Sequence, residues 1–527
     1  MITAIEIENF KAIGERVRVE LKPLTLLFGA NSAGKSTILQ VLHYAGEVFE
    51  RHNLDPDYTG QGGHVVDLGG FRTLVHDRHI SRPMRIRFEV RGAPPSYTDA
   101  DWIDMEDVLG GKSSAGLRRM LDRCSSVYAE IEVVWREFCK GPVVSVYEVG
   151  LDGRAVARTR LSEDGNQAEL DYIDFKHPAL QAREERVQFT LEEEEGVPLV
   201  LEGSAASEET YYTVSVPDLE TLFREQVSGD FPYRFRSQVD QLGRPSALPE
   251  WEQMIELRGA DFSLNAALSR ILVGPGKLVQ NALRNFRYLG PVRAMPPRVY
   301  EPPRYPNQER WADGLAAWDT LHHVDEGFIE EVNTWLLARL KSGYSVRLKR
   351  YYETDMDEMV AGRPGQPRDV KNRVVIVPSG QGIELQLRDV GTGVSQVLPV
   401  VVLALDAQQF LLALEQPELH LHPALQAELG DLFIESALGE RRNTFILETH
   451  SEHLILRVMR RMRETFESRL PEGIPPLHPP DVAVLYVEPT PNGSVVREMP
   501  LNERGELVKA WPGGFFEEGL RELLPES

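Results

Sequence analysis

Apolar and polar residues alternate at the start of the chain, and a helical spacing follows. The alternation predicts strands over residues 2–10 and 17–21, and the apolar run 24–28 predicts a third, buried strand. Over residues 36–49 the apolar residues recur at intervals of three and four, which predicts a helix with one buried face. A glycine-rich loop lies between the buried strand and this helix. Strand, glycine-rich loop and helix in that order are the setting that a phosphate-binding loop requires.

The pattern changes in the middle of the chain and then returns. Short alternating runs separated by glycine, proline and acidic turns predict a β-rich antiparallel subdomain, and the helical spacing after it predicts a helical insertion. Apolar segments typical of a nucleotide-binding core then reappear. The expected fold class is α/β, with a mixed sheet flanked by helices. The expected segments are 1–81 (first half of the core), 82–216 (β-rich subdomain), 217–343 (helical insertion), 344–470 (second half of the core) and 471–527 (small C-terminal domain).

The loop after the third strand carries the phosphate-binding pattern. Gly29 and Gly34 are followed by Lys35 and Ser36, so backbone N–H groups would surround the phosphates, the lysine would add a charge and the serine would ligate Mg²⁺. A plain glycine-rich turn is the alternative, which the flanking strand and helix disfavour. The predicted ATP-binding residues are Asn31, Ser32, Ala33, Gly34, Lys35, Ser36 and Thr37.

Two later apolar strands end in chemically active side chains. The strand within 410–418 ends in an acidic residue, so Glu415 would hold Mg²⁺ through water. The strand within 444–450 ends in His450, which would meet the γ-phosphate from the side. A purely structural role is the alternative for this histidine. ATP and Mg²⁺ are therefore the expected cofactors.

These motifs resemble a known family. The runs 415–423 (Glu-Gln-Pro-Glu-Leu-His-Leu-His-Pro) and 448–453 (Glu-Thr-His-Ser-Glu-His) resemble the RecF-like and OLD-like AAA ATPases related to SMC and ABC proteins, as does Ile-Glu-Asn-Phe-Lys at 7–11. The middle is matched mainly by the order of elements and by Tyr-Leu-Gly-Pro-Val-Arg at 288–293. Residues 511–516 resemble the C-terminal domain of uncharacterised function in the AAA15 branch. The resemblance implies an ABC-type P-loop ATPase head.

The resemblance also implies a head-to-head homodimer, or a higher oligomer, that sandwiches two ATP molecules. Each ATP would be touched by a signature loop of the other subunit, for which 388–396 is the candidate. Gly391 stands where a signature serine is usual, so Thr392 or Ser395 would have to offer the hydroxyl; a turn that only caps the next helix is the alternative. The candidate residues are Gly391, Thr392, Gly393 and Ser395. For sensing Mg²⁺, the family suggests Gln61, beside the more family-like segment 66–71.

The residue after the metal-binding acidic residue determines the rate of ATP hydrolysis that we expect. ABC-type ATPases commonly place a glutamate there to polarise the attacking water, whereas this chain has Gln416. An amide can orient water but has no useful basicity, so general-base help of ~10²- to 10⁴-fold would be absent. We expect a slow ATPase that converts ATP and water to ADP and phosphate, unless another group such as Glu418 assists. The expected catalytic residues are Glu415, Gln416, Glu418 and His450.

Composition restricts the partners and the compartment. The net charge of −23 argues against a surface that binds nucleic acid along its whole length, so such contact would be local, with the basic run 457–463 as the candidate, or through a partner. No secretory signal is recognisable, and the apolar run 397–405 is too short to span a bilayer. The two cysteines, Cys124 and Cys139, fit a reducing compartment. We expect a cytoplasmic protein with no membrane contact.

The resemblance leaves more than one role open. ATPases of this kind occur in bacterial anti-phage defence with a separate effector, often an HNH-type nuclease. The alternatives are a DNA-repair clamp that grips duplex DNA directly and a nucleotide-dependent scaffold. Residues 482–488 resemble the start of the metal-dependent nuclease domain of OLD-like relatives, but only 39 residues follow Glu488 and they contain no Asp-x-Asp pair. A two-metal nuclease within this chain is therefore not expected.

Overall fold

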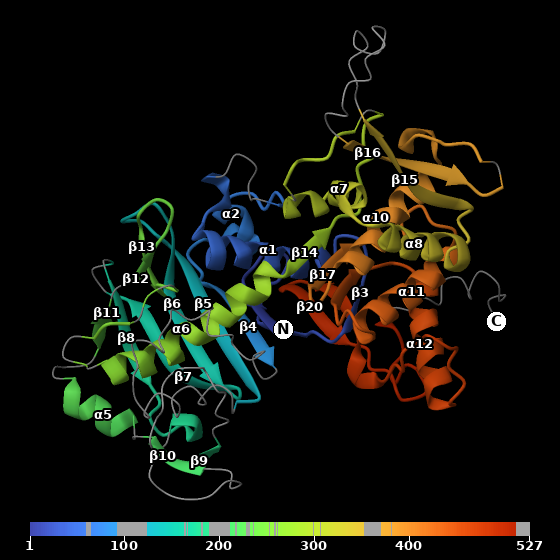
Figure 1. Cartoon of the computed structure of the whole chain (residues 1–527). Coiled ribbons are helices and arrows are strands. Elements are labelled where there is room, and N and C mark those ends of the chain that lie inside the picture. The colour runs from blue at the N-terminus through green and yellow to red at the C-terminus, as the bar shows by residue number, and fades with distance from the viewer. Residues whose placement is uncertain are drawn as a thin grey trace, which may run out of the picture. The chain divides into compact units, whose positions relative to one another are not determined.

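The chain folds as two compact units, each described here by itself (Figure 1). Unit 1 consists of Met1–Ile2, Arg51–Leu54 and Pro83–Gln280, and unit 2 consists of Thr3–Glu50, Asp55–Arg82 and Asn281–Ser527. The computed structural model describes residues 1–58, 65–91, 124–162, 165, 167–180, 183–188, 211–216, 219–227, 232–235, 237–251, 253, 255–257, 260, 262–298, 300–305, 307–352, 370–380 and 382–512.

A six-stranded sheet forms the centre of unit 2. Its order is β14-β17-β18-β3-β19-β20, in which the first five strands are parallel and β20 is antiparallel to β19. The central strands read as nearly unbroken apolar runs because parallel strands are buried on both faces. Their carboxyl ends share one edge, where functional side chains collect. The bounds are β14 Phe286–Leu289, β17 Leu411–Glu415, β18 Thr444–Glu448, β3 Leu24–Phe28, β19 Val482–Thr490 and β20 Gly493–Glu498.

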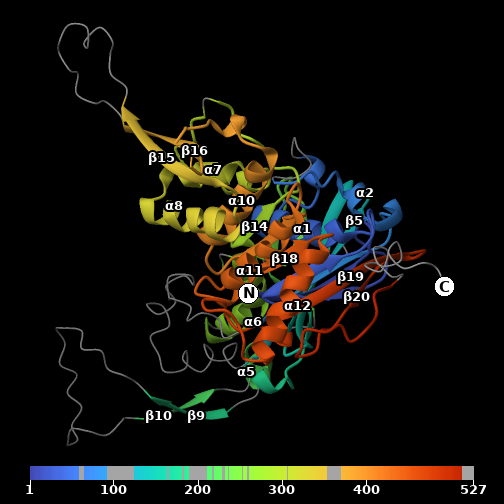
Figure 2. The ribbon, with the colours of Figure 1, turned by 90° about the vertical axis from the view of Figure 1, so that its right-hand side faces the viewer.

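Helices cover both faces of this sheet. One face, which carries Leu24 and Leu26, packs with helices α7, α8, α10, α11 and α12 into one apolar core. On the other face lies α1, where the ring of His43 contacts those of Phe286 and Tyr288. The hairpin of β15 and β16 packs on α7 and α8 (Figure 2). The bounds are α1 Lys35–Arg51, α7 Leu315–His323, α8 Glu326–Asn333, α10 Thr392–Asp406, α11 Pro423–Leu438, α12 Glu452–Phe466, β15 Tyr344–Tyr352 and β16 Val370–Pro378.

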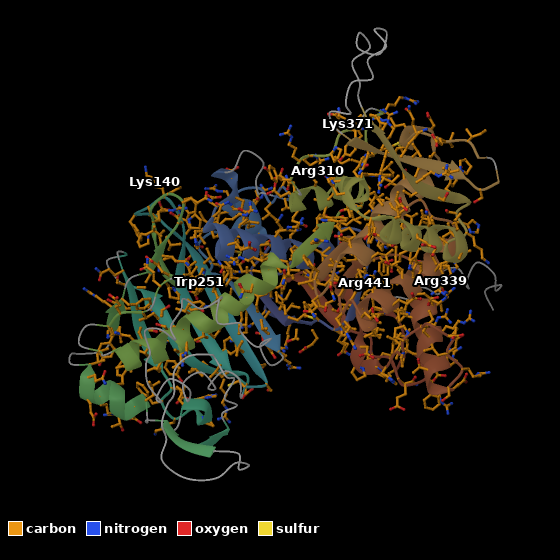
Figure 3. The ribbon with its side chains drawn as sticks, in the orientation of Figure 1. Lys140, Trp251, Arg310, Arg339, Lys371 and Arg441 are labelled. Carbon is orange, nitrogen blue, oxygen red and sulfur yellow. The ribbon has the colours of Figure 1, made fainter. Side chains whose placement is uncertain are left out.

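Arginines join the helices of unit 2 (Figure 3). Arg441 donates to Glu331 at 2.8 Å and to the carbonyl oxygen of Leu405 at 2.7 Å, so it connects α8 to the end of α10. Arg339 forms an ion pair with Glu435 on α11. Smaller elements complete the unit: β1 Ile2–Glu8, β2 Val17–Glu20, η1 Pro56–Tyr58, α2 Phe71–Leu74, η2 His76–Arg78, η5 Gln308–Trp311, the π-helical turn η6 Thr334–Arg339, η7 Leu387–Asp389 and η8 Pro479–Asp481.

Unit 1 is built on an antiparallel sheet. Its strands follow the order β11-β8-β7-β6-β5-β4, and α6 lies along one face (Figure 1). The Tyr147 hydroxyl donates to the carbonyl oxygen of Leu272 in α6 at 2.8 Å, and Trp251 packs edge-on against the same tyrosine. The bounds are β4 Met84–Arg91, β5 Ser126–Arg136, β6 Gly141–Leu151, β7 Arg154–Leu161, β8 Ala168–Ile173, η4 Pro178–Leu180, β9 Arg183–Gln188, β10 Tyr211–Val216, α5 Leu219–Gln226, β11 Tyr233–Phe235, β12 Ser237–Val239, β13 Pro245–Pro249 and α6 Phe262–Arg284.

The predicted fold class is confirmed. The chain is α/β, with a mostly parallel mixed sheet flanked by helices and a separate antiparallel sheet. The stretch 217–343, expected to be a helical insertion, also contains the short strands β11, β12, β13 and β14. The five-segment division stays a prediction. Gln61 and residues 513–516 of the C-terminal resemblance lie outside the described residues.

Candidate functional site

The loop between β3 and α1 has a backbone that suits glycine at two positions. Gly29 has a φ of 146° and Gly34 a φ of 95°, which residues with a side chain rarely adopt. A Cβ atom on Gly29 would lie 2.4 Å from the carbonyl oxygen of Val487, and one on Gly34 would lie 2.7 Å from Cβ of Ala12. The loop therefore turns tightly into the N-terminus of α1, where backbone N–H groups and the helix dipole favour phosphate.

All seven predicted phosphate-binding residues lie in this loop and the first turn of α1. Lys35 is buried, and its Nζ donates to the carbonyl oxygens of Gly29 at 3.1 Å and Ala30 at 3.0 Å. Burial lowers the pKa of Lys35, and the nearby charge of Glu448 opposes that effect. The ammonium group thus already lies at the loop. Of the others, Asn31 and Ser32 are exposed, Gly34 and Ser36 are partly buried, and Ala33 and Thr37 are buried.

Ser36, the predicted Mg²⁺ ligand, is hydrogen-bonded to a residue that the sequence reasoning did not select. Its hydroxyl donates to Glu448 Oε2 at 2.8 Å, and Glu448 Oε1 lies 3.8 Å from Lys35 Nζ. Glu448 ends β18, which lies between β3 and β17, and its Cα is the register partner of Glu415. The two predicted groups of the metal site, Ser36 and Glu415, are therefore connected through Glu448.

Glu415 is held at the end of β17 by a tyrosine from the neighbouring strand. The hydroxyl of Tyr288 donates to Glu415 Oε1 at 2.9 Å. Burial raises the pKa of Glu415, and this hydrogen bond opposes the rise. Burial also raises the pKa of Tyr288, with the charge of Glu415 adding to it, so the phenol stays a donor. The orientation of the predicted metal-binding carboxylate thus depends on β14.

Arg293 connects the acidic strand to the candidate signature loop. Its side chain is buried and donates to the carbonyl oxygens of Glu415 and Gln416, both at 3.1 Å, and of Gln396 at 3.3 Å. In return, Gln396 Nε2 donates to the carbonyl oxygen of Arg293 at 3.0 Å. Burial lowers the pKa of Arg293 to about 10, so the guanidinium is still charged at neutral pH. The motif at 288–293 therefore supports two separate parts of the site.

The remaining predicted catalytic residues lie just after two neighbouring strands, Gln416 and Glu418 after β17 and His450 after β18. Gln416 has a positive φ of 44°, and its backbone N–H donates to the carbonyl oxygen of Glu448 at 2.7 Å. Glu418 Oε1 accepts the backbone N–H of His450 at 2.8 Å. Burial raises the pKa of Glu418 and lowers the pKa of His450, which the charge of Lys35 lowers further. All four predicted catalytic residues thus lie beside the phosphate loop.

The candidate signature loop is only partly available to a second subunit. Gly391 is the N-cap residue of α10 and is exposed, and a Cβ on it would meet nothing within 4 Å. A Cβ on Gly393 would lie 3.5 Å from the carbonyl oxygen of His420. Ser395 is buried on the inner side of α10, so its hydroxyl is not at the surface. The side chain of Thr392 lies outside the described residues.

The hairpin β19–β20 supports the phosphate loop from a segment far away in sequence. The hydroxyl of Ser494 donates to the carbonyl oxygen of Ala33 at 2.7 Å, and its backbone N–H donates to that of Ala12 at 2.7 Å. A Cβ on Gly34 would lie 2.8 Å from Ser494 Oγ. The shape of the loop is therefore fixed partly by residues near the C-terminus.

The charges at this sheet edge fit a divalent cation. Burial, followed by the charge of Glu415, raises the pKa of Glu448 to about 7, and the pKa of Glu415 and of Glu418 is raised by burial. Carboxylates crowded in this way gain from a cation that offsets their charge. Carboxylate and hydroxyl oxygens are the ligands that Mg²⁺ prefers, and Ser36 offers a hydroxyl beside them. The residues present therefore fit Mg²⁺.

The sequence reasoning missed Glu448, Tyr288 and Arg293 as site residues. Each of them had a feature in the sequence that could have indicated it. Glu448 is the only acidic residue within its apolar strand, and Tyr288 and Arg293 are the first and last residues of the motif at 288–293. The contacts themselves depend on strand pairing between distant segments, which one sequence does not reveal.

The basic run 457–463 forms ion pairs within unit 2. Arg457 pairs with Glu428 at 2.8 Å and with Asp431 at 2.5 Å. Arg461 pairs with the same buried aspartate at 2.7 Å, and Arg460 pairs with Glu464. Arg457 and Arg461 thus hold α12 on α11, and the pair of Arg460 lies within α12, so these three arginines offer little unpaired charge to phosphates. Among the described residues, no helix has both the length and the apolar character needed to cross a membrane.

Three family models match parts of the chain. Residues 1–56 match "AAA ATPase domain", residues 296–457 match "AAA domain, putative AbiEii toxin, Type IV TA system", and residues 477–524 match "Protein of unknown function". The first two segments contain the phosphate loop, Glu415 and His450. The chain thus carries the AAA ATPase domains expected from the sequence, a domain type that binds and hydrolyses ATP, followed by a segment from a family without an assigned function.

SMC head domains are among the similar solved structures. An SMC head bound to the C-winged helix domain of ScpA has 13% identity and a TM-score of 0.36, covering 95% of this chain and 98% of that chain. One from Pyrococcus furiosus, with an extended coiled coil and bound to the C-terminal domain of ScpA, has 13% identity and a TM-score of 0.37, covering 95% and 96%. The SMC head domain from Thermotoga maritima has 10% identity and a TM-score of 0.36, covering 95% and 99%. No curated protein is significantly similar in sequence to this chain.

Proposed function

We propose that this chain is a Mg²⁺-dependent ATP switch. It hydrolyses ATP slowly, dimerises around the nucleotide and signals to a separate effector, such as an HNH-type nuclease in anti-phage defence. The observation that carries the proposal is the convergence of Lys35 and Ser36 with Glu415 and Glu448 at one sheet edge. This arrangement supplies a cation for the phosphates and oxygen ligands for Mg²⁺. When bound, Mg²⁺ would neutralise phosphate charge.

Slow turnover follows from the groups that face the attacking water. Gln416 can orient water through its amide but cannot take a proton. Glu418 is the nearest downstream carboxylate, and one of its oxygens is committed to the backbone N–H of His450. A site with these groups binds ATP more readily than the site hydrolyses ATP. The ATP-bound state is therefore long-lived in our proposal.

Hydrogen bonds around the site connect the position of the γ-phosphate to the exposed start of α10. A change at the γ-phosphate would be felt by His450, which is tied to Glu418. Arg293 connects the same turn to Gln396 at the start of α10. The exposed Gly391 is the N-cap residue of that helix, so closure around ATP would change the surface offered to a second copy. The effector would bind the closed dimer, and ATP cleavage would release it.

The first experiment measures nucleotide binding, single-turnover cleavage and oligomeric state on the full chain, with Lys35→Ala as the inactive control. We expect tight Mg²⁺-ATP binding, slow cleavage and a dimer that forms with ATP but not with ADP. Multiple turnovers at the rate of a motor ATPase would refute the switch. Absence of nucleotide binding would refute the function altogether.

A direct DNA clamp is the competing role, and the ion pairs of Arg457 and Arg461 disfavour it. Filter binding of duplex DNA across a salt series separates the two roles, because a clamp that contacts phosphates loses affinity steeply with salt. We expect weak binding without the effector and retention of a nuclease that co-purifies with the ATP-bound chain. The family name matched at 296–457 mentions a toxin–antitoxin system, so growth arrest on expression, with and without the neighbouring reading frames, is a useful further readout.

A further inference from the structure

We propose that Glu448 is a second carboxylate of the Mg²⁺ site and that it holds the ion together with Ser36 and Glu415. This inference rests on the proposed function, because it concerns the metal used with ATP. It assigns a role to an acidic residue outside the run 415–418 that carries the predicted metal acid.

The hydrogen bond from Ser36 is the first reason. A serine that ligates Mg²⁺ uses a lone pair of its oxygen, so its proton must go to an acceptor. Glu448 Oε2 accepts that proton at 2.8 Å, across a sequence separation of 412 residues. The lone pairs of Ser36 Oγ then point away from Glu448 Oε2 and are available to a metal ion. Such a partner fixes a metal ligand in the orientation that the ion needs.

The strand register is the second reason. Glu415 and Glu448 are Cα partners on adjacent parallel strands, and each is the last residue of its strand. Residues paired in this way lie on the same side of the sheet edge, so the two carboxylates face one volume. Tyr288 holds Glu415 from the far side, which leaves Glu448 between Glu415 and the phosphate loop.

The local charge is the third reason. Glu415, Glu448 and the buried Glu418 lie within electrostatic range of one another, and Lys35 and Arg293 are the cations that act on them. Lys35 is shared between two backbone carbonyls, and Arg293 donates to three others. Lys35 also forms the 3.8 Å ion pair with Glu448, so its single charge is divided among these groups. A divalent ion at Ser36 offsets the excess negative charge.

The same contacts permit an opposite role, which the experiment must distinguish. Glu448 contacts the hydroxyl of Ser36 and approaches the ammonium of Lys35, the two groups that a nucleotide phosphate and its metal would use. In that role Glu448 would act as an internal competitor, and removing its charge would strengthen ATP binding with or without metal. A metal-holding residue strengthens only the binding that depends on metal.

The test compares ATP affinity in Mg²⁺ with ATP affinity in EDTA, by calorimetry on the full chain. For Glu448→Gln we expect the Mg²⁺ enhancement to fall roughly 10- to 100-fold, while the affinity in EDTA stays within about twofold of wild type. Manganese titration of the nucleotide complex, followed by electron paramagnetic resonance, should show weaker metal binding without reference to turnover. Glu440→Gln, an exposed residue just before β18, is the matched control and should change neither quantity.

Three outcomes overturn the inference: an unchanged Mg²⁺ enhancement, tighter ATP binding in both conditions, or an equal loss in both. Ser36→Ala and the double variant provide a further check, because two residues that hold one ion lose non-additive amounts of metal affinity. If Glu448→Gln fails to fold, Glu448→Asp is the second variant. It keeps the charge on a side chain shorter by one methylene group, and it should still lower the Mg²⁺ enhancement of ATP affinity several-fold. Wild-type chain that binds no nucleotide would refute the proposed function instead, so the two failures are distinguishable.

Discussion

Replacing Arg293 tests whether one buried side chain joins the acidic turn to α10. Arg293→Met keeps the bulk of the side chain but removes the donors to the carbonyl oxygens of Glu415, Gln416 and Gln396. A hydrogen bond from a charged donor contributes about 1.5–3 kcal/mol. Two good bonds at 3.1 Å and a longer one at 3.3 Å therefore suggest a loss of about 3–5 kcal/mol of unfolding free energy, because the carbonyl oxygens left without a donor are partly buried.

The assay is thermal unfolding of the full chain in the absence of nucleotide. A loss of that size should lower the midpoint of unit 2 by roughly 5–10 °C. Arg293→Lys keeps a charge on a shorter, unforked side chain and should lose about half as much. Arg298→Met is the control, since Arg298 is exposed and pairs with Asp389 at the surface, where solvent screens the ion pair. If Arg293→Met unfolds within about two degrees of that control, the connecting role is wrong.

Three further predictions concern the chemistry of the site. Gln416→Glu should raise the single-turnover cleavage rate at least about tenfold by adding a base; quench-flow measures it, and an unchanged rate would mean that another group already provides the base. Tyr288→Phe removes the donor to Glu415 and should weaken Mg²⁺-ATP binding about tenfold but leave binding in EDTA intact; equal loss in both would contradict the reasoning. Burial raises the pKa of Glu448 from its ordinary 4.5 to about 7, so the folded chain holds a proton that the unfolded chain has released, and stability without metal should fall as pH rises between these values. Glu448→Gln should flatten that slope in thermal unfolding, and an unchanged slope would refute the assignment.

Local pattern was sufficient to predict the strand and the helix that flank the phosphate-loop motif. The buried run 24–28 became β3 with the predicted bounds, and the helix expected over 36–49 runs over Lys35–Arg51. Both depend on spacing within a few residues. In the predicted helical insertion, by contrast, α6 ends at Arg284, because Phe286 pairs with Leu411 as the start of β14.

The contacts that complete the site could not be predicted from local pattern. The bond from Ser36 to Glu448 joins residues 412 positions apart, and it exists only because β18 lies between β3 and β17. Glu448 is the last residue of an apolar strand. In a sequence, an acidic residue at that position is easily interpreted as the start of a surface turn. The burial of Ser395 was equally invisible in the sequence, which offers a hydroxyl near Gly391 without showing that this side chain is buried.

The hairpin β19–β20 changes how the C-terminal segment should be regarded. Residues 477–524 match a family without an assigned function, yet within it β19 pairs directly with β3, the strand that leads into the phosphate loop. A chain truncated before residue 477 would leave β3 as an open sheet edge, which invites aggregation, and would lose the Ser494 support beneath Ala33. This part of the segment is thus a structural component of the nucleotide site, and deletion experiments that treat it as a detachable regulatory tail would report the collapse of the ATPase itself.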